Sequence, residues 1–183
     1  MIKVAFTGGG TGGHVYPGIA IAEHLRDGLE TELFWIGSNN GIEKDIVKAA
    51  GIPFWGISAG KLRRYISIKN IIDFFRVIGG FFAARTILKR ENPVLLFSKG
   101  GFVSVPPSAA AFSLGIPVFT HESDYSPGLA TRINSRFAQY IFTAYPQTRL
   151  MLSSRCQYKV RTMGNPVRRE FFCADAKRGR DFL

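Results

Sequence analysis

Short apolar runs alternate with longer stretches of mixed polarity along the chain. Runs such as Val94-Leu95-Leu96-Phe97 lack polar alternation, which is typical of strands buried on both faces of a sheet. The pattern predicts strands near residues 2–7, 32–37, 52–57, 93–98, 116–120 and 139–143, and helices near residues 17–27, 41–50, 67–90, 106–114 and 127–137. Strands that alternate with helices indicate parallel βαβ units. The predicted fold class is therefore α/β, a doubly wound, Rossmann-like parallel sheet with both faces covered.

The same pattern divides the chain into one compact domain and a short terminal segment. The 183 residues suffice for one domain with a hydrophobic core, which we assign to residues 1–163. Residues 164–183 begin with Gly164-Asn165-Pro166-Val167-Arg168, an extended turn that leaves a strand. Phe171 and Phe172 then precede a basic tail, with no further strand to bury them. Two interpretations stay open: a frayed terminus, or a linker and the start of a second domain.

The first candidate for chemistry is the glycine-rich segment Gly8 to Gly13. It follows the predicted strand and precedes Pro17, a residue favoured at the first position of a helix. Glycines let a backbone approach an anion closely, and a helix N-terminus presents unpaired N–H groups. The segment therefore predicts a cradle for a phosphorylated ligand. A tight strand-to-helix turn that binds nothing is the alternative.

Two familiar nucleotide-binding classes fit this segment poorly. The spacing satisfies the dinucleotide pattern G-x-G-x-x-G, but five glycines in six positions satisfy many patterns. That pattern also needs a carboxylate near the end of the second strand, and Gly37-Ser38-Asn39-Asn40 supplies none. A nicotinamide-dependent oxidoreductase is therefore disfavoured. No Gly-Lys-Ser/Thr follows the glycines, which excludes a P-loop.

Two further loops follow predicted strands and should meet the first at the carboxyl edge of the sheet. The segment from Ser98 to Pro107 contains two glycines and opens a helix through prolines. His121-Glu122-Ser123-Asp124 brings an imidazole and two carboxylates, which bind sugar hydroxyls or act as general bases. Ser and Asp are equally good helix caps, so that interpretation stays open. His14 has little core to join among glycines, which favours a role in the site; holding the loop through a backbone hydrogen bond is the alternative.

The charge distribution adds an anionic partner. The chain carries a formal net charge of +11, and residues 61–90 hold eight Lys/Arg against one Asp, a local net of +7. No recognisable nucleic-acid motif accompanies these residues, so nucleic acid is not expected as a partner.

Cys156 and Cys173 are far apart and lack metal-ligand spacing, so both are interpreted as intracellular thiols and neither metal nor cofactor is expected. The N-terminus shows no signal peptide, and no apolar run reaches the ~18 residues of a membrane span.

Part of this basic charge lies beside apolar side chains. Within residues 68–90, helical spacing gathers one apolar face with a basic residue beside it: Ile71, Phe74, Phe75, Ile78, Phe82 and Arg76. An apolar surface rimmed by Lys and Arg is how peripheral proteins bind an anionic bilayer. The segment therefore predicts a membrane contact. A core helix whose basic residues form its solvated face is the alternative.

Four motifs occur along the chain in a fixed order. They are Gly9-Gly10-Thr11-Gly12-Gly13-His14-Val15-Tyr16-Pro17-Gly18, Gly100-Gly101-Phe102-Val103-Ser104, His121-Glu122-Ser123-Asp124 and Gly164-Asn165-Pro166-Val167-Arg168. Together they resemble the MurG family of N-acetylglucosaminyltransferases, over essentially the whole chain. The resemblance implies a glycosyltransferase B fold, with this chain as its N-terminal, acceptor-binding half. It also implies transfer of N-acetylglucosamine from UDP-N-acetylglucosamine to lipid I, undecaprenyl-pyrophosphoryl-muramyl-pentapeptide, giving lipid II for peptidoglycan at the cytoplasmic face of the cell membrane.

The resemblance further implies roles for individual residues. The acceptor pyrophosphate would lie against Gly10, His14, Gly100, Gly101 and Phe102. The donor would contact Thr11, Gly12, Gly13, Asp124 and Arg168. His14 is the candidate catalytic residue, nearest the reacting C4 hydroxyl of N-acetylmuramic acid. Many family members have His-Glu-Gln-Asn where this chain has His121-Glu122-Ser123-Asp124; Asp124 keeps the oxygen acceptors, loses the amide donors and adds charge.

Sugar transfer needs donor and acceptor held together in a closed cleft. Most uridine and sugar contacts of the family belong to a C-terminal domain, so these residues alone are expected to be inactive. A separate chain that supplies such a domain is a further expected partner, beside UDP-N-acetylglucosamine, lipid I and the anionic membrane surface. The alternative is a non-catalytic, membrane-recruiting subunit of a split glycosyltransferase.

Overall fold

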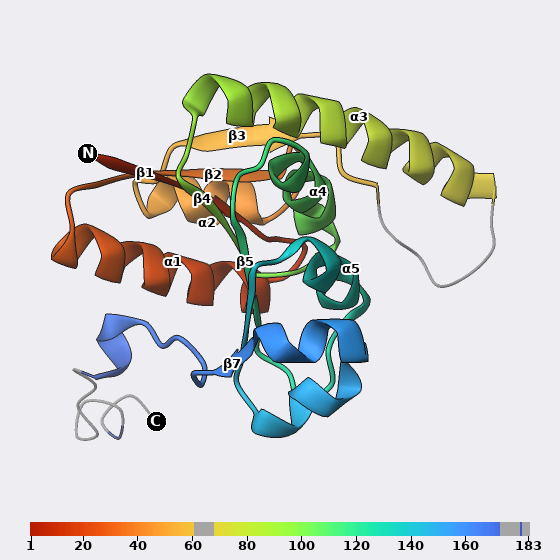
Figure 1. Cartoon of the computed structure of the whole chain (residues 1–183). Helices are drawn as coiled ribbons and strands as arrows, with labels where there is room; N and C mark the ends of the chain where they lie inside the picture. The colour runs from red at the N-terminus through yellow and green to blue at the C-terminus, as the bar shows by residue number, and fades with distance from the viewer. Residues whose placement is uncertain (61–67, 173–179, 181–183) are drawn as a thin grey trace.

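A computed structural model describes residues 1–60, 68–172 and 180, without the side chains of residues 68–74 and 170. Seven parallel strands form one sheet with helices on both faces (Figure 1). The strands are β1 (Ile2–Thr7), β2 (Thr31–Ser38), β3 (Phe54–Ile57), β4 (Leu95–Ser98), β5 (Val118–Glu122), β6 (Tyr140–Thr143) and β7 (Val160–Thr162). Their order is β3-β2-β1-β4-β5-β6-β7, so the winding direction reverses between β1 and β4. The predicted doubly wound, Rossmann-like sheet is confirmed.

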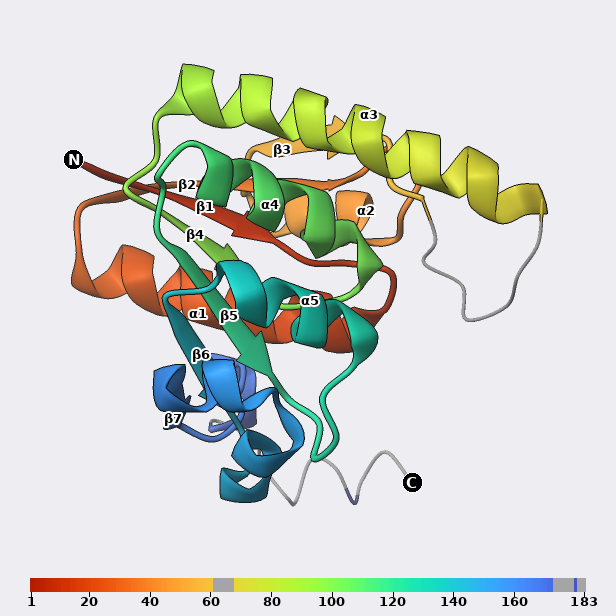
Figure 2. The ribbon, with the colours of Figure 1, turned by 45° about the vertical axis from the view of Figure 1, so that its right-hand side comes forward.

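Within the described residues, five α-helices connect most of these strands. They are α1 (Gly12–Gly28), α2 (Glu43–Ala49), α3 (Ile68–Glu91), α4 (Val105–Ser113) and α5 (Leu129–Phe137). One face of the sheet is covered by α1 and α2, and the other by α3, α4 and α5 (Figure 2). None of the described helices is both long and apolar enough to cross a bilayer.

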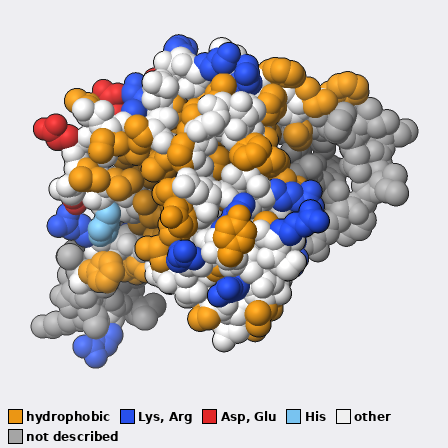
Figure 3. All heavy atoms as spheres, viewed as in Figure 1, with side chains coloured by type: hydrophobic (Ala, Val, Ile, Leu, Met, Phe, Trp, Pro, Cys, Tyr) orange, Lys and Arg blue, Asp and Glu red, His pale blue; other side chains and the backbone are white. Residues whose placement is uncertain are grey.

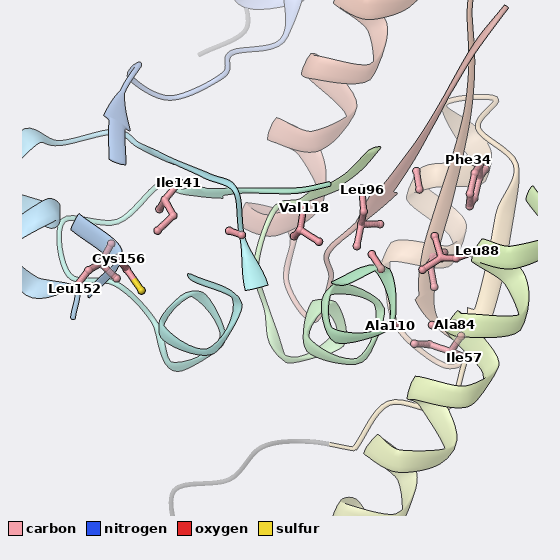
Figure 4. Close-up of a cluster of buried hydrophobic side chains, with 14 of the residues drawn as sticks. Phe34, Ile57, Ala84, Leu88, Leu96, Ala110, Val118, Ile141, Leu152 and Cys156 are labelled. Carbon is pink, nitrogen blue, oxygen red and sulfur yellow. The ribbon is translucent and has the colours of Figure 1, made fainter. Parts of the chain in front are cut away.

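Alternate residues of each central strand feed two separate cores. Phe34 and Ile36 of β2 pack with Ala84 and Leu88 of α3 (Figure 4). Their neighbour Trp35 points the other way, into the core under α1 and α2. This division explains why the strands appear in the sequence as uninterrupted apolar runs, because both faces of the sheet are buried.

One predicted boundary is wrong. α1 begins at Gly12, inside the glycine segment, and Pro17 lies within the helix rather than at its start. The backbone N–H of His14 already donates to the Thr11 carbonyl at 3.1 Å, so the first turn is built from glycines. A proline inside a helix removes one backbone hydrogen bond, and here α1 continues through Pro17 despite that loss.

The structure adds short elements that the apolar pattern did not predict. Beyond β6 the chain forms the 3-10 turns η2 (Pro146–Met151) and η3 (Ser154–Lys159) before β7; η1 (Phe102–Ser104) precedes α4, and η4 (Arg169–Phe171) follows the sheet. A three-residue strand and 3-10 segments of three to six residues are too short to show a periodicity. Gly80 also has a packing role, because a Cβ there would overlap the Ser58 carbonyl oxygen where α3 crosses the loop after β3.

Candidate functional site

The loops after β1 and β4 meet at the carboxyl edge of the sheet, where the winding direction reverses. In open α/β sheets this is where ligands bind. A Cβ on Gly101 would overlap the carbonyl oxygen of Gly9, so the two loops touch backbone to backbone. Gly100 and Gly101 have φ angles of 86° and 77°, which glycine adopts readily and other residues rarely do. Glycine is therefore required here by both space and conformation.

A buried carboxylate holds the first glycine loop from below. Glu43, the first residue of α2, is fully buried. Its Oε2 accepts a hydrogen bond from the Gly10 N–H at 3.1 Å, and its Oε1 accepts one from the Ser38 N–H at 2.8 Å. A Cβ on Gly9 would overlap this carboxylate. The N–H of Gly10, a predicted phosphate contact, is thus already bonded to an anion of the protein itself.

His14 lies in the first turn of α1 and faces the second glycine loop. Its Nδ1 lies 3.2 Å from the Lys99 carbonyl oxygen. Because a carbonyl only accepts, Nδ1 carries the proton and Nε2 keeps its lone pair. Burial, followed by the positive charge of Lys99, lowers the pKa of His14, which favours the neutral imidazole. The backbone hydrogen bond, one of the two interpretations of His14, is confirmed, and it leaves the second nitrogen available to a ligand.

The loop after β5 is built around His121 and Glu122. His121 Nε2 donates to the Gly164 carbonyl at 2.9 Å, which ties the loop to the terminal segment. The two oxygens of Glu122 accept hydrogen bonds from the N–H groups of Asp124 and Gly128, both at 3.0 Å. Gly128 is the N-cap of α5 and has no side-chain cap of its own. The alternative interpretation, in which Ser123 or Asp124 caps this helix, is therefore wrong; the longer Glu122 side chain accepts the N–H groups of the turn instead.

A buried lysine links this loop to the others. Lys99 directly follows β4 and is 1% exposed, and its Nζ donates to Ser123 Oγ at 2.7 Å. Burial lowers the pKa of Lys99 to about 8, against the opposing influence of Glu122 and Asp124. Lys99 is therefore mostly charged at pH 7, inside the protein and close to two carboxylates.

The loops enclose a pocket of about 250 Å³. Its wall comes from the β1 loop, the β4 loop, the β5 loop and the start of α5: Gly9, Gly10, Thr11, His14, Gly101, Phe102, Glu122, Asp124, Gly128, Leu129, Ala130 and Thr131. The structure thus brings together most predicted acceptor residues and two predicted donor residues, Thr11 and Asp124. Within the described part of the chain, no three His, Cys, Asp or Glu side chains gather in a way that would hold a metal ion.

The other predicted ligand contacts lie around the pocket rather than on its wall. Gly12 and Gly13 form the start of α1, and Gly100 borders the His14 ring. Arg168 lies apart: its guanidinium stacks 4.6 Å from the centre of the Tyr16 ring and 5.4 Å from that of Phe171. This places Arg168 against α1, outside the residues that line the pocket.

The predicted membrane residues lie on α3, which contributes no residue to the wall of the pocket. Phe75, Ile78 and Phe82 are 66%, 37% and 61% exposed, and Arg76 is exposed beside them. The side chains of Ile71 and Phe74 lie outside the described residues. Hydrophobic and basic side chains share this face of the molecule, over α3 and the helices next to it (Figure 3).

One exposed aromatic side chain on α4, the helix that packs beside α3, was missed by the sequence reasoning. Phe112 of α4 is 58% exposed and packs on Phe137 of α5, with 5.6 Å between ring centres. The hydrophobic pattern predicted that this helix packs on the sheet, but it did not show which of its side chains stay exposed. Glu43 and Lys99 were missed as well. Lys99 carries a sequence signal, a charge between an apolar run and two glycines, whereas nothing distinguishes Glu43 from Asp45 in the same helical turn.

A parallel sheet that reverses its winding beside two touching glycine loops defines a Rossmann-like domain, in which ligands bind at the point of reversal. The chain belongs to glycosyltransferase family 28: residues 4–143 match the family's N-terminal domain. It is 52% identical over its full length to the UDP-N-acetylglucosamine–N-acetylmuramyl-(pentapeptide) pyrophosphoryl-undecaprenol N-acetylglucosamine transferase of Treponema denticola, covering 49% of that protein. The transferase of the same name from Shouchella clausii is 49% identical over 93% of the chain and is covered to 47%.

Solved structures agree with this assignment. The MurG of Acinetobacter baumannii superposes with a TM-score of 0.75 at 26% identity, with 93% of this chain and 47% of that one covered. The MnaA protein of S. aureus, solved with UDP, shares the fold with a TM-score of 0.67 at 13% identity, with 91% and 44% covered. The chain spans about half the length of the curated relatives it matches. It therefore resembles the N-terminal half of MurG transferases.

Proposed function

We propose that this chain is the acceptor-binding half of an N-acetylglucosaminyltransferase that makes lipid II from lipid I and UDP-N-acetylglucosamine. Family membership and the names of its transferase relatives support the reaction class. The observation that carries the proposal is His14, a neutral imidazole oriented by a carbonyl on the wall of a pocket between two glycine loops. In this proposal residues 1–163 form the acceptor domain, and residues 164–183 lead toward a donor-binding domain.

His14 acts as the general base in the proposed reaction. Its Nε2 accepts the proton of the C4 hydroxyl of N-acetylmuramic acid while that oxygen attacks the anomeric carbon of N-acetylglucosamine. The bond from the anomeric carbon to the β-phosphate oxygen breaks, and UDP leaves with the electron pair, so the configuration at the carbon inverts. The Nδ1–H bond to Lys99 fixes the tautomer that this step needs.

The diphosphates occupy the glycine loops in this arrangement. The acceptor pyrophosphate lies against Gly10, Gly100, Gly101 and Phe102, close to the N-terminus of α1. A helix of this length presents partial positive charge and unpaired N–H groups at that end. The donor approaches from the other side, toward Thr11, Gly12 and Gly13, with Asp124 on the pocket wall and Arg168 on the segment that follows the sheet.

The exposed face of α3 docks on the membrane in the same proposal. Lipid I carries an undecaprenyl chain, so its muramyl group is reached only at the bilayer surface. Phe75, Ile78, Phe82 and Phe112 supply apolar area, and basic side chains such as Arg76 face anionic headgroups. The expected location is the cytoplasmic face of the cell membrane, as a peripheral protein.

Replacing Phe82 with Ser should weaken binding to vesicles of phosphatidylglycerol and phosphatidylcholine about tenfold, because one exposed Phe no longer enters the bilayer. Co-sedimentation over a range of lipid concentrations measures the effect. Phe172→Ser is the matched control, since Phe172 is 75% exposed outside α3. Equal losses in both variants, or none in Phe82→Ser, would remove α3 from the membrane contact.

The transferase function is tested by fusing residues 1–168 to the C-terminal half of the Treponema denticola relative. Transfer of labelled N-acetylglucosamine to a lipid I analogue is measured for this fusion, for the 183 residues alone and for the intact relative. We expect transfer by the fusion and the relative, and none by the 183 residues. A folded fusion that binds UDP-N-acetylglucosamine and vesicles but transfers nothing would overturn the proposal in favour of a recruiting subunit.

A further inference from the structure

Lys99 is the one lysine among the described residues whose pKa is strongly shifted, and the proposed reaction gives its side chain no role. Lysine is among the residues least often buried, because removing an ammonium from water is costly. Here the whole residue is 1% exposed, although it carries a charge at neutral pH. A position that retains such a group next to a pocket calls for an explanation beyond packing.

The contacts of Lys99 join three loops of the site. Its backbone N–H donates to the Thr7 carbonyl at the end of β1, at 2.8 Å. Its carbonyl accepts the Nδ1–H of His14 from α1, at 3.2 Å. Its side chain passes close under Gly8, where an added Cβ would lie 3.1 Å from the Lys99 Cβ, and ends in the 2.7 Å bond to Ser123 Oγ.

The charged groups around Lys99 fall into two sets. Glu122 and Asp124, from the β5 loop, attract the ammonium. His14 from α1 and His121 from β5 are the nearby bases, and the charge of Lys99 is the second cause, after burial, that lowers the pKa of each. The residues that line the pocket include these two carboxylates and no Lys or Arg, so an anionic diphosphate there would face their repulsion.

We propose that Lys99 is the positioning residue of this pocket: its carbonyl orients the His14 ring, while its buried ammonium holds the Ser123–Asp124 turn and offsets the pocket carboxylates. The inference rests on the proposed function for its meaning, since it assigns the charge that, after burial, opposes protonation of the base. The contacts themselves belong to these residues, so they can be tested without sugar transfer.

The test is an NMR titration of the imidazole C–H signals in the 183-residue chain and in its Lys99→Met variant, which keeps the length and removes the charge. The signals of His14, His24 and His121 are assigned with His→Gln variants. We expect the titration midpoints of His14 and His121 to move upward in Lys99→Met, and the signal of His24, exposed on α1, to be unaffected by the substitution. Lys48→Met is the matched control, because Lys48 is an exposed lysine on α2.

A second measurement needs no variant and covers the case in which Lys99→Met does not fold. In the unmodified chain, loss of the Lys99 proton near pH 8 should move the His14 ring signals and the Ser123 amide signal in one common step. Unchanged His14 and His121 midpoints in folded Lys99→Met, or no common step near pH 8, would overturn the inference. Either result leaves the transfer assay of the fusion untouched, so the two proposals fail separately.

Discussion

Replacing His14 with Ala in the fused transferase should lower the rate of N-acetylglucosamine transfer by roughly 10²–10⁴-fold, the usual contribution of a positioned general base. The variant removes the nitrogen that would accept the C4 hydroxyl proton, while the glycine loops keep their own support. Glu43 still holds the first loop, and Gly101 still packs on Gly9. The loss should therefore appear in kcat, with a smaller change in the KM for the lipid I analogue.

His24→Ala is the matched control, because His24 is exposed further along the same helix. The pH dependence of the transfer rate is a second measurement. Because the pKa of His14 is lowered, the rate should stay constant as the pH falls through the ordinary imidazole range and should decrease only at lower pH. A His14→Ala fusion that keeps more than about a tenth of the rate would show that another group takes the proton.

The second large effect is a loss of stability at acid pH that originates at His121. Burial, and then the charge of Lys99, lower the pKa of His121 to about 4, against an unfolded value of 6.5. Between these values the unfolded chain binds more protons than the folded one, so the free energy of unfolding falls as the pH falls. The full contribution is present above pH 6.5 and is lost as the pH drops through 4. The difference between these two pKa values corresponds to roughly 3 kcal/mol.

Urea unfolding of the chain at pH 7 and at pH 4.5 measures this loss. In His121→Gln the change between the two pH values should shrink, because the titrating group is gone. His24→Gln should keep the full change. The structure gives the physical reason, since His121 Nδ1 is buried without a hydrogen-bond partner among the described atoms, so the proton it gains would have no acceptor. An identical pH dependence in His121→Gln would assign the acid sensitivity elsewhere.

The sheet could be predicted because its strands are buried on both faces. Each central strand appears as an apolar run with a turn on either side, and β4 and β5 fall within two residues of their expected positions. The start of α1 could not be predicted, because Gly12 and Gly13 have poor helix propensity and take their conformation from the packing of the loop. β7 escaped for a different reason: three residues give no period.

The sequence predicted the loops of the site but not the two buried residues that support them. Parallel strands end at a common edge, so glycines and a histidine that follow strands are expected to meet there, and His14, Gly101 and Asp124 do. Glu43 and Lys99 act through contacts with residues far away in the sequence, and the spacing of residues does not predict such contacts. Arg168 shows the converse, since its motif is plain in the sequence while its side chain rests on Tyr16 outside the pocket.

The inward-facing carboxylate of Glu43 bears on how this fold separates one ligand class from another. In dinucleotide-binding relatives of the fold, an acidic group beyond the second strand faces outward to the ribose. Here the acid from that region lies beneath the glycines and accepts hydrogen bonds from the backbone N–H groups of Gly10 and Ser38. The loop therefore has its working shape before any ligand arrives, and binding loses little conformational entropy. The chain thus has the glycine pattern of nicotinamide enzymes, but the carboxylate that would bind their cofactor is bonded to the protein's own backbone.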